Sequence, residues 1–303
     1  MTARHRVILA AVLLLTAFTY RNALHNGFVW DDTFTIVNNR ALDSLGSAGS
    51  WFTDPDTWSS RNEASYRPVI TAGFGGDVAL SGRNPAWFHA VNIGIHLAVI
   101  VLAYLLAVRL WNHAGSALVA AGIVALHPIN AEAVNYVSAR SSLLTACFVL
   151  ASVAAWSRAE RGSGSVPWLA AGLGLGLGAL ALGTKETAVV LPLLIMAWDR
   201  ATSGPDRPFT ATIRASIPWW VLVAAYLALR TWLLAGKVTE RPIGDGAWQP
   251  VLLAIKIFLV SLWSWFVPTG SAVDHGWAWR IGAGALPQDP GDRSGPRGRK
   301  VSP

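Results

Sequence analysis

Long apolar segments recur along almost the whole of this 303-residue chain and restrict the folds open to it. Hydrophobic residues make up 53% of the chain and charged residues only 14%, whereas an average soluble domain is about 25% charged. Segments of this kind cross a bilayer as helices, because a helix satisfies its backbone internally. We therefore predict an all-α, polytopic transmembrane bundle of about eight helices. The apolar segments lie at about 7–20, 88–108, 115–126, 142–157, 166–183, 187–198, 216–235 and 249–267.

The basic residues between these segments predict how the chain is threaded through the membrane. Arg4 and Arg6 precede the first segment, which lacks a clear small-x-small cleavage pattern and is interpreted as an uncleaved span. Basic residues mark cytoplasmic connections, so the N-terminus and alternate connections are expected in the cytoplasm. The connections at 33–87, 127–140, 183–186 and 237–245 then face outside. The sequence predicts a multi-pass integral membrane protein, of a bacterial inner membrane or an equivalent one, with a long extracytoplasmic first loop.

The net charge of +7 does not indicate nucleic-acid binding. No aromatic–basic RNA motif or helix-turn-helix pattern is present, and arginines at helix ends explain the charge. Cys147 is the single cysteine, so an intrachain disulfide is excluded. Sixteen tryptophans suit a protein with many membrane–water interfaces. The expected partner is therefore a lipid bilayer.

Asp31 and Asp32 stand together just after the first apolar segment. Acids at a membrane edge are costly to keep and mark functional sites. One of them could accept a proton from an acceptor hydroxyl while the other holds it or a sugar in place. The alternative is a turn or helix cap where the chain leaves the bilayer.

Other polar residues on the predicted outer side form further candidates. Arg67 lies in the long loop, and a guanidinium suits phosphate oxygens, although a solvated loop arginine is the simpler interpretation. His89, Asn92 and His96 share one helix face, where hydrogen bonding between helices is at least as good an explanation as substrate contact. This set lacks the ligand spacing of a zinc site. The run 68–80 predicts a helix lying on the membrane surface.

Two short outer connections carry the remaining candidates. His127 ends one apolar segment, and Glu132 and Arg140 flank the next short stretch. Arg140 either pairs with Glu132 or binds a phosphate. Lys185 and Glu186 interrupt an apolar run as interface anchors or site residues, and Lys185 would suit a lipid-linked phosphate.

Taken in order, these motifs resemble one family. Asn26-Gly27-Phe28-Val29-Trp30-Asp31-Asp32, Tyr66-Arg67-Pro68 and Phe88-His89-Ala90-Val91-Asn92 with His96 are similar to the start of the membrane domain of transmembrane O-mannosyltransferases that target cadherins, and of their bacterial relatives. Similarity continues through Leu126–Val134, Ser138-Ala139-Arg140, Gly183-Thr184-Lys185-Glu186-Thr187, Val267-Pro268 and Val273-Asp274-His275. It covers about residues 20–277, with Gly183-Thr184 where the family usually has serine.

The resemblance implies a glycosyltransferase of the GT-C type, with its catalytic acid in the first outer loop. Such enzymes transfer a sugar, here mannose, from a polyprenyl-phosphate donor to Ser or Thr hydroxyls of exported proteins. By position, Asp31 is the general base and Asp32 its neighbour, and the predicted substrate-binding residues are Arg67, His89, Asn92, His127, Glu132, Arg140, Lys185 and Glu186. No cofactor is expected beyond the lipid-linked donor, and a need for a divalent metal stays open.

Family members usually continue into further membrane helices and tetratricopeptide repeats. After Trp279 this chain changes to glycine, proline and arginine, so we expect a truncated GT-C-like domain at 1–279 and a disordered basic tail at 280–303. Asp274 and His275 fall on the predicted cytoplasmic side and receive no role. Three alternatives remain: a transferase for a lipid or glycan acceptor, a non-catalytic transporter or assembly subunit, and an inactive fragment.

Overall fold

The structure, a computed structural model, describes residues 2–61, 65–160, 167–204, 206–237 and 248–266. These residues form helices and connections without a strand, which confirms the predicted all-α class. Each of the eight apolar segments corresponds to a helix. The helices are α1 (Ala3–Thr19), α4 (Pro85–Trp111), α5 (Ala114–Leu126), α7 (Arg140–Glu160), α8 (Pro167–Thr184), α9 (Leu191–Thr202), α10 (Phe209–Leu234) and α11 (Gln249–Phe266).

Some of these helices are long and apolar enough to cross a membrane, which makes this a membrane protein. Four such segments are found among the described residues: Ala3–His25, Pro85–Trp111, Val137–Arg158 and Phe209–Leu234. A fifth results if Ala114–Leu126 and Pro128–Asn135, bent by 48°, count as one broken span. Trp168–Thr184 and Val251–Trp263 are shorter, as the sequence predicted for several segments.

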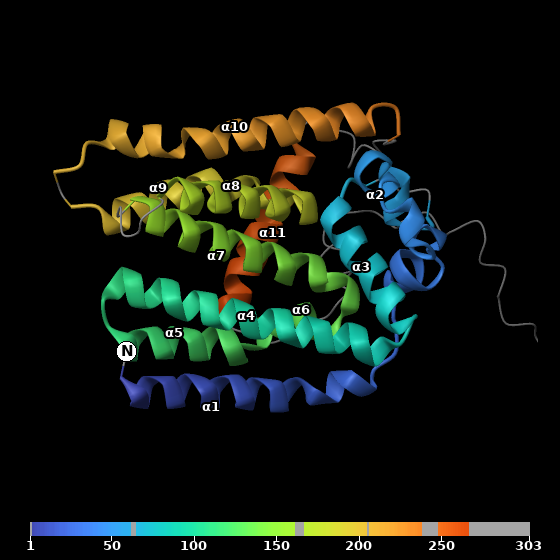
Figure 1. Cartoon of the computed structure of the whole chain (residues 1–303), viewed down its shortest axis with the longest axis horizontal. Coiled ribbons are helices and arrows are strands. Elements are labelled where there is room, and N and C mark those ends of the chain that lie inside the picture. The colour runs from blue at the N-terminus through green and yellow to red at the C-terminus, as the bar shows by residue number, and fades with distance from the viewer. Residues whose placement is uncertain (1, 62–64, 161–166, 205, 238–247, 267–303) are drawn as a thin grey trace, which may run out of the picture. The chain divides into compact units, whose positions relative to one another are not determined.

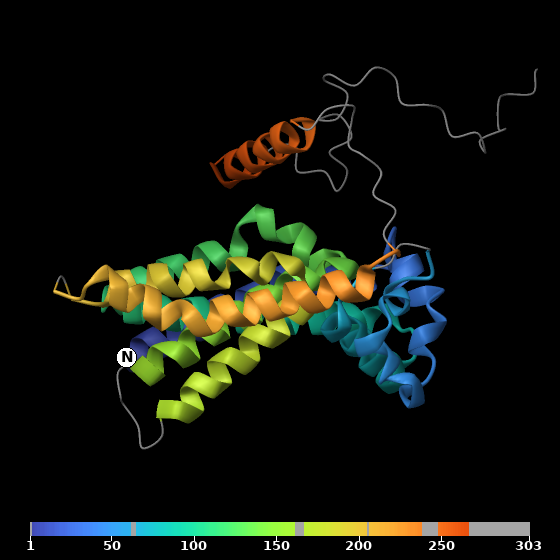
Figure 2. The same cartoon turned by 90° about the horizontal axis from the view of Figure 1, so that it is seen from above.

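The chain divides into two units, 1–252 and 253–303. In the first unit the long helices lie side by side, with α5 between α1 and α4 and α7 between α4 and α8 (Figures 1 and 2). Helix α10 packs on α8 and α9. Successive helices reverse direction, so alternate connections collect at the end opposite the N-terminus. We call this the distal end; it holds the connections 20–84, 127–139 and 185–190. Every predicted site residue lies in one of these connections or close to it.

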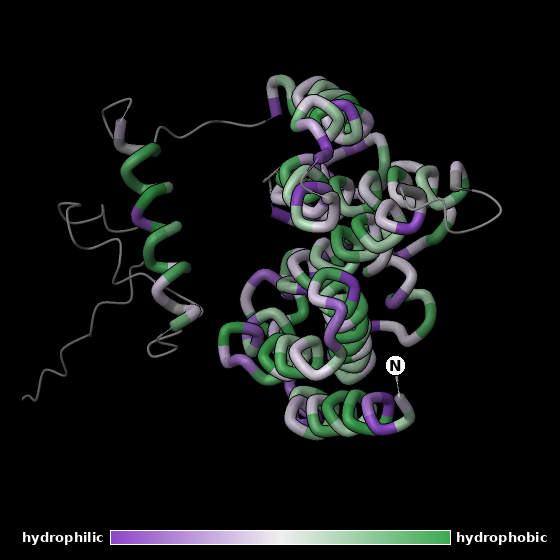
Figure 3. The backbone as a smooth tube through the Cα atoms, turned by 90° about the vertical axis from the view of Figure 1, so that its left-hand side faces the viewer, coloured by the Kyte–Doolittle hydropathy of each residue, from purple (hydrophilic) through white to green (hydrophobic). Residues whose placement is uncertain are grey.

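Close packing of α7 on α8 illustrates how the bundle is held together. The Ser152 hydroxyl donates to the Gly174 carbonyl at 2.7 Å. A Cβ at Gly174 would come within 3.3 Å of the Ser152 backbone oxygen, so glycine allows this approach. Such contacts between small residues are typical of membrane helices. Seen end-on, the helices of the bundle carry many hydrophobic residues, with hydrophilic ones among them (Figure 3).

The long first loop is more structured than the sequence predicted. Its described residues contain the π-helical turn η2 (Thr33–Val37), three 3-10 turns, a short helix α2 (Ser50–Thr53) and the helix α3 (Pro68–Ser81). The helix expected at 68–80 is present, but it does not simply lie on the surface, because Ile70 and Phe74 are buried with Phe88 of α4. The loop is therefore a small packed layer over the distal end.

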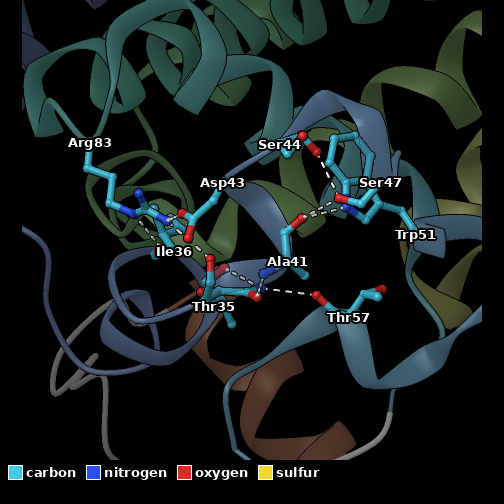
Figure 4. A network of polar contacts seen from close by, with 10 residues as sticks. Thr35, Ile36, Ala41, Asp43, Ser44, Ser47, Trp51, Thr57 and Arg83 are labelled. Atoms are coloured by element: carbon cyan, nitrogen blue, oxygen red, sulfur yellow. Dashed lines mark hydrogen bonds and ion pairs between the residues drawn. The ribbon is translucent and has the colours of Figure 1, made fainter. Parts of the chain in front are cut away.

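A network of polar contacts fixes this layer (Figure 4). Arg83 donates to the carbonyls of Ile36 and Asn39 at 3.0 and 3.1 Å and forms an ion pair with Asp43 at 2.6 Å. The Trp51 indole donates to the Ala41 carbonyl at 2.9 Å. Because Arg83 precedes α4 and reaches back to η2, it ties the start of the loop to its end.

The second unit contains only part of α11 among its described residues. The predicted domain boundary at 279, the basic tail at 280–303, and Asp274 and His275 lie outside the described residues.

Candidate active site

A polar cavity of about 420 Å³ opens in the distal end. Four of the residues predicted from sequence line it: Asp31, Arg67, Glu132 and Lys185. They come from three separate connections, 20–84, 127–139 and 185–190, so only the folded bundle brings them together. The remaining lining residues are aromatic, hydroxyl-bearing or basic, apart from Ala139: Phe34, Thr35, Trp58, Ser59, Arg61, Ser65, Tyr136, Ser138, Ser141 and Ser142.

A tight turn presents Asp31 to this cavity. The Asp32 N–H donates to the Val29 carbonyl at 3.0 Å, and the Thr35 N–H donates to the Asp31 carbonyl at 2.8 Å. Trp30, between Val29 and Asp31, has φ of +51°. This left-handed conformation is rare for a bulky residue. This conformation reverses the chain and leaves the Asp31 side chain exposed. An exposed carboxylate in a polar cavity can accept a proton from a bound hydroxyl.

Asp32 has the opposite environment and is completely buried. It accepts hydrogen bonds from the Ser138 N–H at 2.8 Å, from the Ser138 hydroxyl at 2.5 Å and from the Val29 N–H at 3.1 Å. Burial raises the pKa of Asp32 above its ordinary value, although these bonds and the nearby His89 act against that rise. Asp32 thus joins the turn to the connection after α6 (Ala131–Asn135) and does not line the cavity.

Tyr136 connects both sides of this arrangement. Its hydroxyl oxygen accepts the Asp31 N–H at 3.1 Å, and its ring lines the cavity. Burial, together with the charges of Asp31 and Asp32, raises the pKa of Tyr136 to about 12. The phenol is therefore neutral at physiological pH and can donate its hydrogen.

The basic side of the cavity is formed by Arg67 and Lys185. Arg67 forms an ion pair with Glu186 at 3.1 Å and stacks over Trp58 at 5.1 Å. Its buried Nε finds no hydrogen-bond partner within the described part of the chain. The Lys185 ammonium donates to the Ser142 hydroxyl at 2.9 Å. Two cations within one cavity can bind a phosphate.

Burial and charge set the ionisation of this basic side. Burial, and then the charge of Arg67, lowers the pKa of Lys185 below its ordinary value of 10.5, while Glu186 and Glu132 act in the opposite direction. Burial alone would raise the pKa of Glu186, but its own backbone N–H, Arg67 and Arg230 bring that pKa below the ordinary value. Glu186 is therefore ionised and holds Arg67, with Arg230 of α10 at 4.0 Å on its other side.

Arg140 differs most from its expected surroundings. Its side chain is only 2% exposed and does not line the cavity. It forms an ion pair with Asp77 of α3, donates to Asn92 at 2.7 Å and to the Phe88 carbonyl at 2.9 Å. The sequence predicted either an ion pair with Glu132 or an open phosphate site for Arg140. The guanidinium contacts neither of these. A buried charge needs such complete pairing, so Arg140 joins α3, α4 and α7 beneath the cavity.

The other predicted residues divide between the cavity and its support. His89, Asn92 and His96 are buried in α4. Asn92 donates to the Tyr136 carbonyl at 3.2 Å, and the His96 ring contacts the Ala125 carbonyl at 3.2 Å. His127 accepts the Ile129 N–H at 3.2 Å and caps a 3-10 turn. Of the acids predicted after Asp32, Glu132 lines the cavity and Glu186 lies behind Arg67.

Sequence reasoning missed Tyr136, Ser138, Arg61 and Asp77. Ser138 belongs to a quoted motif, but its small hydroxyl gave no separate signal. Asp77 could have been found, because an acid within the apolar run 68–80 is a functional-site candidate by default. In the described part of the chain no cluster of three or more His, Cys, Asp or Glu side chains is placed to hold a metal ion.

The fold and this cavity define a helical membrane protein with an acid-and-base site at one end of its bundle. In sequence the chain is similar to protein O-mannosyl-transferase TMTC3 of Mus musculus, with 31% identity over 67% of this chain and 22% of that protein. It is also similar to protein O-mannosyl-transferase TMTC1 of Homo sapiens, with 33% identity over 63% of this chain and 23% of that protein. The similarity predicted from the motifs is thereby confirmed.

These similarities have a defined extent. Protein O-mannosyl-transferase TMTC4 of Homo sapiens is 33% identical over 58% of this chain and 27% of its own length. The chain thus spans about a quarter of the length of the curated relatives it matches. No family model matches it, and no solved structure does.

Proposed function

We propose that this chain forms the membrane-embedded catalytic part of a glycosyltransferase. The enzyme would transfer mannose from a polyprenyl-phosphate donor to Ser or Thr hydroxyls of exported proteins, at the extracytoplasmic face of a multi-pass membrane protein. The observation that carries the proposal is the cavity that Asp31 shares with Arg67 and Lys185. The names of the relatives supply the sugar and the protein acceptor.

The reaction assigns a role to each side of the cavity. Asp31 removes the proton from the acceptor hydroxyl, and the hydroxyl oxygen forms a bond to the anomeric carbon of the donor. The bond between that carbon and the phosphate oxygen breaks, and the phosphate leaves with the electron pair. Arg67 and Lys185 would stabilise the negative charge that develops on it, as preorganised charges do in a cavity of low dielectric. Attack opposite the leaving group inverts the anomeric configuration.

The lining also suits a sugar. Trp58, Phe34 and Tyr136 offer flat apolar faces, and several serine hydroxyls offer hydrogen bonds. Glu132 is exposed in the same cavity and can accept a hydrogen bond from a sugar hydroxyl. The base and both cations that these steps use are side chains that line the cavity.

The experiment is a transfer assay with the full chain, polyprenyl-phosphate mannose and a Ser/Thr-containing acceptor peptide. Asp31→Asn keeps the shape of the side chain and removes the base, so transfer should fall about 100-fold or more. Asp206→Asn, an exposed aspartate far from the cavity in sequence and at the other end of the bundle, is the matched control and should keep full activity. Equal activity of wild type and Asp31→Asn would contradict the assignment.

A further inference from the structure

We infer that Tyr136 is the positioning residue of Asp31, and that a buried polar chain running from Asp77 through Arg140 and Asn92 holds Tyr136 in place. The Tyr136 hydroxyl would donate to the Asp31 carboxylate and leave one carboxylate oxygen directed at the acceptor. The inference rests on the proposed function of Asp31 as the base. It also assigns a task to two buried residues, Asn92 and Arg140, that do not line the cavity.

The backbone of Asp31 fixes the hydroxyl of Tyr136 from one side. Its oxygen accepts the Asp31 N–H at 3.1 Å. A phenol has one hydrogen to donate in addition to the lone pairs with which it accepts, so this hydrogen points elsewhere. The Asp31 side chain acts on the phenol, because its charge and hydrogen bonding help to raise the pKa of Tyr136, and both residues line the same cavity. Tyr136 therefore holds the backbone of Asp31 directly and has one hydrogen left to donate to its carboxylate.

The backbone of Tyr136 is pinned as well. Its N–H donates to the Glu132 carbonyl at 3.0 Å, and its carbonyl accepts from Asn92 at 3.2 Å. The Asn92 side-chain oxygen in turn accepts from Arg140 at 2.7 Å. Arg140 is paired with Asp77, and all three of its nitrogens have partners. The chain is buried throughout up to Tyr136, so each member has one favourable arrangement.

The phenol of Tyr136 is suited to donating a hydrogen bond to Asp31. It is not suited to accepting the substrate proton. Burial and the two aspartates raise the pKa of Tyr136 to about 12, so the hydrogen stays on its oxygen over the working pH range. A donor that stabilises the ionised carboxylate keeps Asp31 available as a base, and it fixes the orientation of the carboxylate.

Several other charges surround Asp31, and the test must leave them in place. Tyr136→Phe removes one hydroxyl and no charge, so every one of them is kept. On the cavity side these groups are Arg61, Arg67, Glu132 and Lys185, and behind it they are Asp32, His89 and Arg140.

The experiment compares Tyr136→Phe with Tyr104→Phe in the full-length chain. The Tyr104 hydroxyl on α4 is buried and has no hydrogen-bond partner within the described part of the chain, so its removal is a matched control. For Tyr136→Phe we expect kcat to fall about 10-fold or more, the effect of one hydrogen bond to a charged group. We expect the acid limb of the pH–rate profile to move to higher pH, because a donor to the carboxylate is lost, with an unchanged KM for the donor. Tyr104→Phe should change none of these.

A second readout does not depend on activity. Water-soluble carbodiimides react with protonated carboxyl groups, so amidation of Asp31, followed by mass spectrometry against pH, reports its ionisation. In Tyr136→Phe amidation should extend to higher pH than in wild type. Superimposable amidation profiles, or loss of folding in Tyr136→Phe but not in Tyr104→Phe, would overturn the inference and leave Tyr136 with a structural role. An inactive wild type with a shifted amidation profile would instead contradict the proposed function alone.

Discussion

At the residue scale, two neighbouring aspartates have opposite environments. Asp31 is exposed in the cavity, whereas Asp32 is buried and accepts three hydrogen bonds. Trp30 precedes both in a left-handed conformation, and the hydrogen bonds from Ser138 and Val29 hold only the Asp32 side chain inside. We assign proton transfer to Asp31 and give Asp32 the task of holding the turn against Ser138.

Lys185 supplies a pH-dependent prediction at the same scale. Its pKa is lowered by burial and by Arg67, so the ammonium loses its proton at a lower pH than an ordinary lysine would. The donor is a phosphodiester whose single negative charge does not change in this range. We therefore expect donor affinity to fall as the pH rises toward 10.5, measured by titration with fluorescent polyprenyl-phosphate sugar. In Lys185→Arg the fall should disappear, because a guanidinium stays charged; an equally steep fall in that variant would exclude Lys185 as its cause.

At the element scale, the layer formed by the first loop depends on close contact between α2 and α3. The Trp51 ring lies against Gly75, where a Cβ would come within 2.3 Å of a ring carbon. At Gly76, one position along the helix, a Cβ would meet no atom within 4 Å. Comparing an alanine substitution at Gly75 with one at Gly76 therefore separates the effect of packing from the effect of helix propensity.

We predict that Gly75→Ala destabilises the protein by about 1–3 kcal/mol, the usual cost of overpacking. Gly76→Ala should be neutral or stabilising by about 0.4–1 kcal/mol, because alanine favours a helix. Thermal unfolding of both variants in detergent measures the difference. Equal midpoints would show that Trp51 does not pack on α3 as described.

The sequence predicted where the helices lie better than it predicted the side-chain contacts between them. Apolar length was enough to locate all eight helices, since a bilayer demands helices of that kind. The rule that alternate connections share a side was enough to bring Asp31, Arg67 and Lys185 into one group. It could not predict that Arg140 pairs with Asp77 or that Tyr136 contacts Asp31, because such contacts depend on how helices rotate and tilt against each other. A pattern of polar residues also does not show which of them are buried.

At the scale of the whole molecule, the proposal requires the distal end to lie outside the cytoplasm. Single cysteines at Asn26 and Gly204, both exposed and at opposite ends of the bundle, can report this in a Cys147→Ser background. A membrane-impermeant maleimide added to intact cells should label Asn26→Cys. It should label Gly204→Cys only after permeabilisation. The reverse pattern would place the cavity on the cytoplasmic side and exclude exported proteins as acceptors.

The central claim is that one cavity holds both the base and the site for the donor phosphate. Measuring donor binding and sugar transfer on the same two variants, Asp31→Asn and Arg67→Ala, tests it most directly. The claim predicts that Asp31→Asn binds the donor as wild type does but transfers about 100-fold less sugar. It predicts that Arg67→Ala binds the donor about 10-fold more weakly or worse. Unchanged donor affinity in Arg67→Ala, together with unchanged transfer in Asp31→Asn, would contradict it.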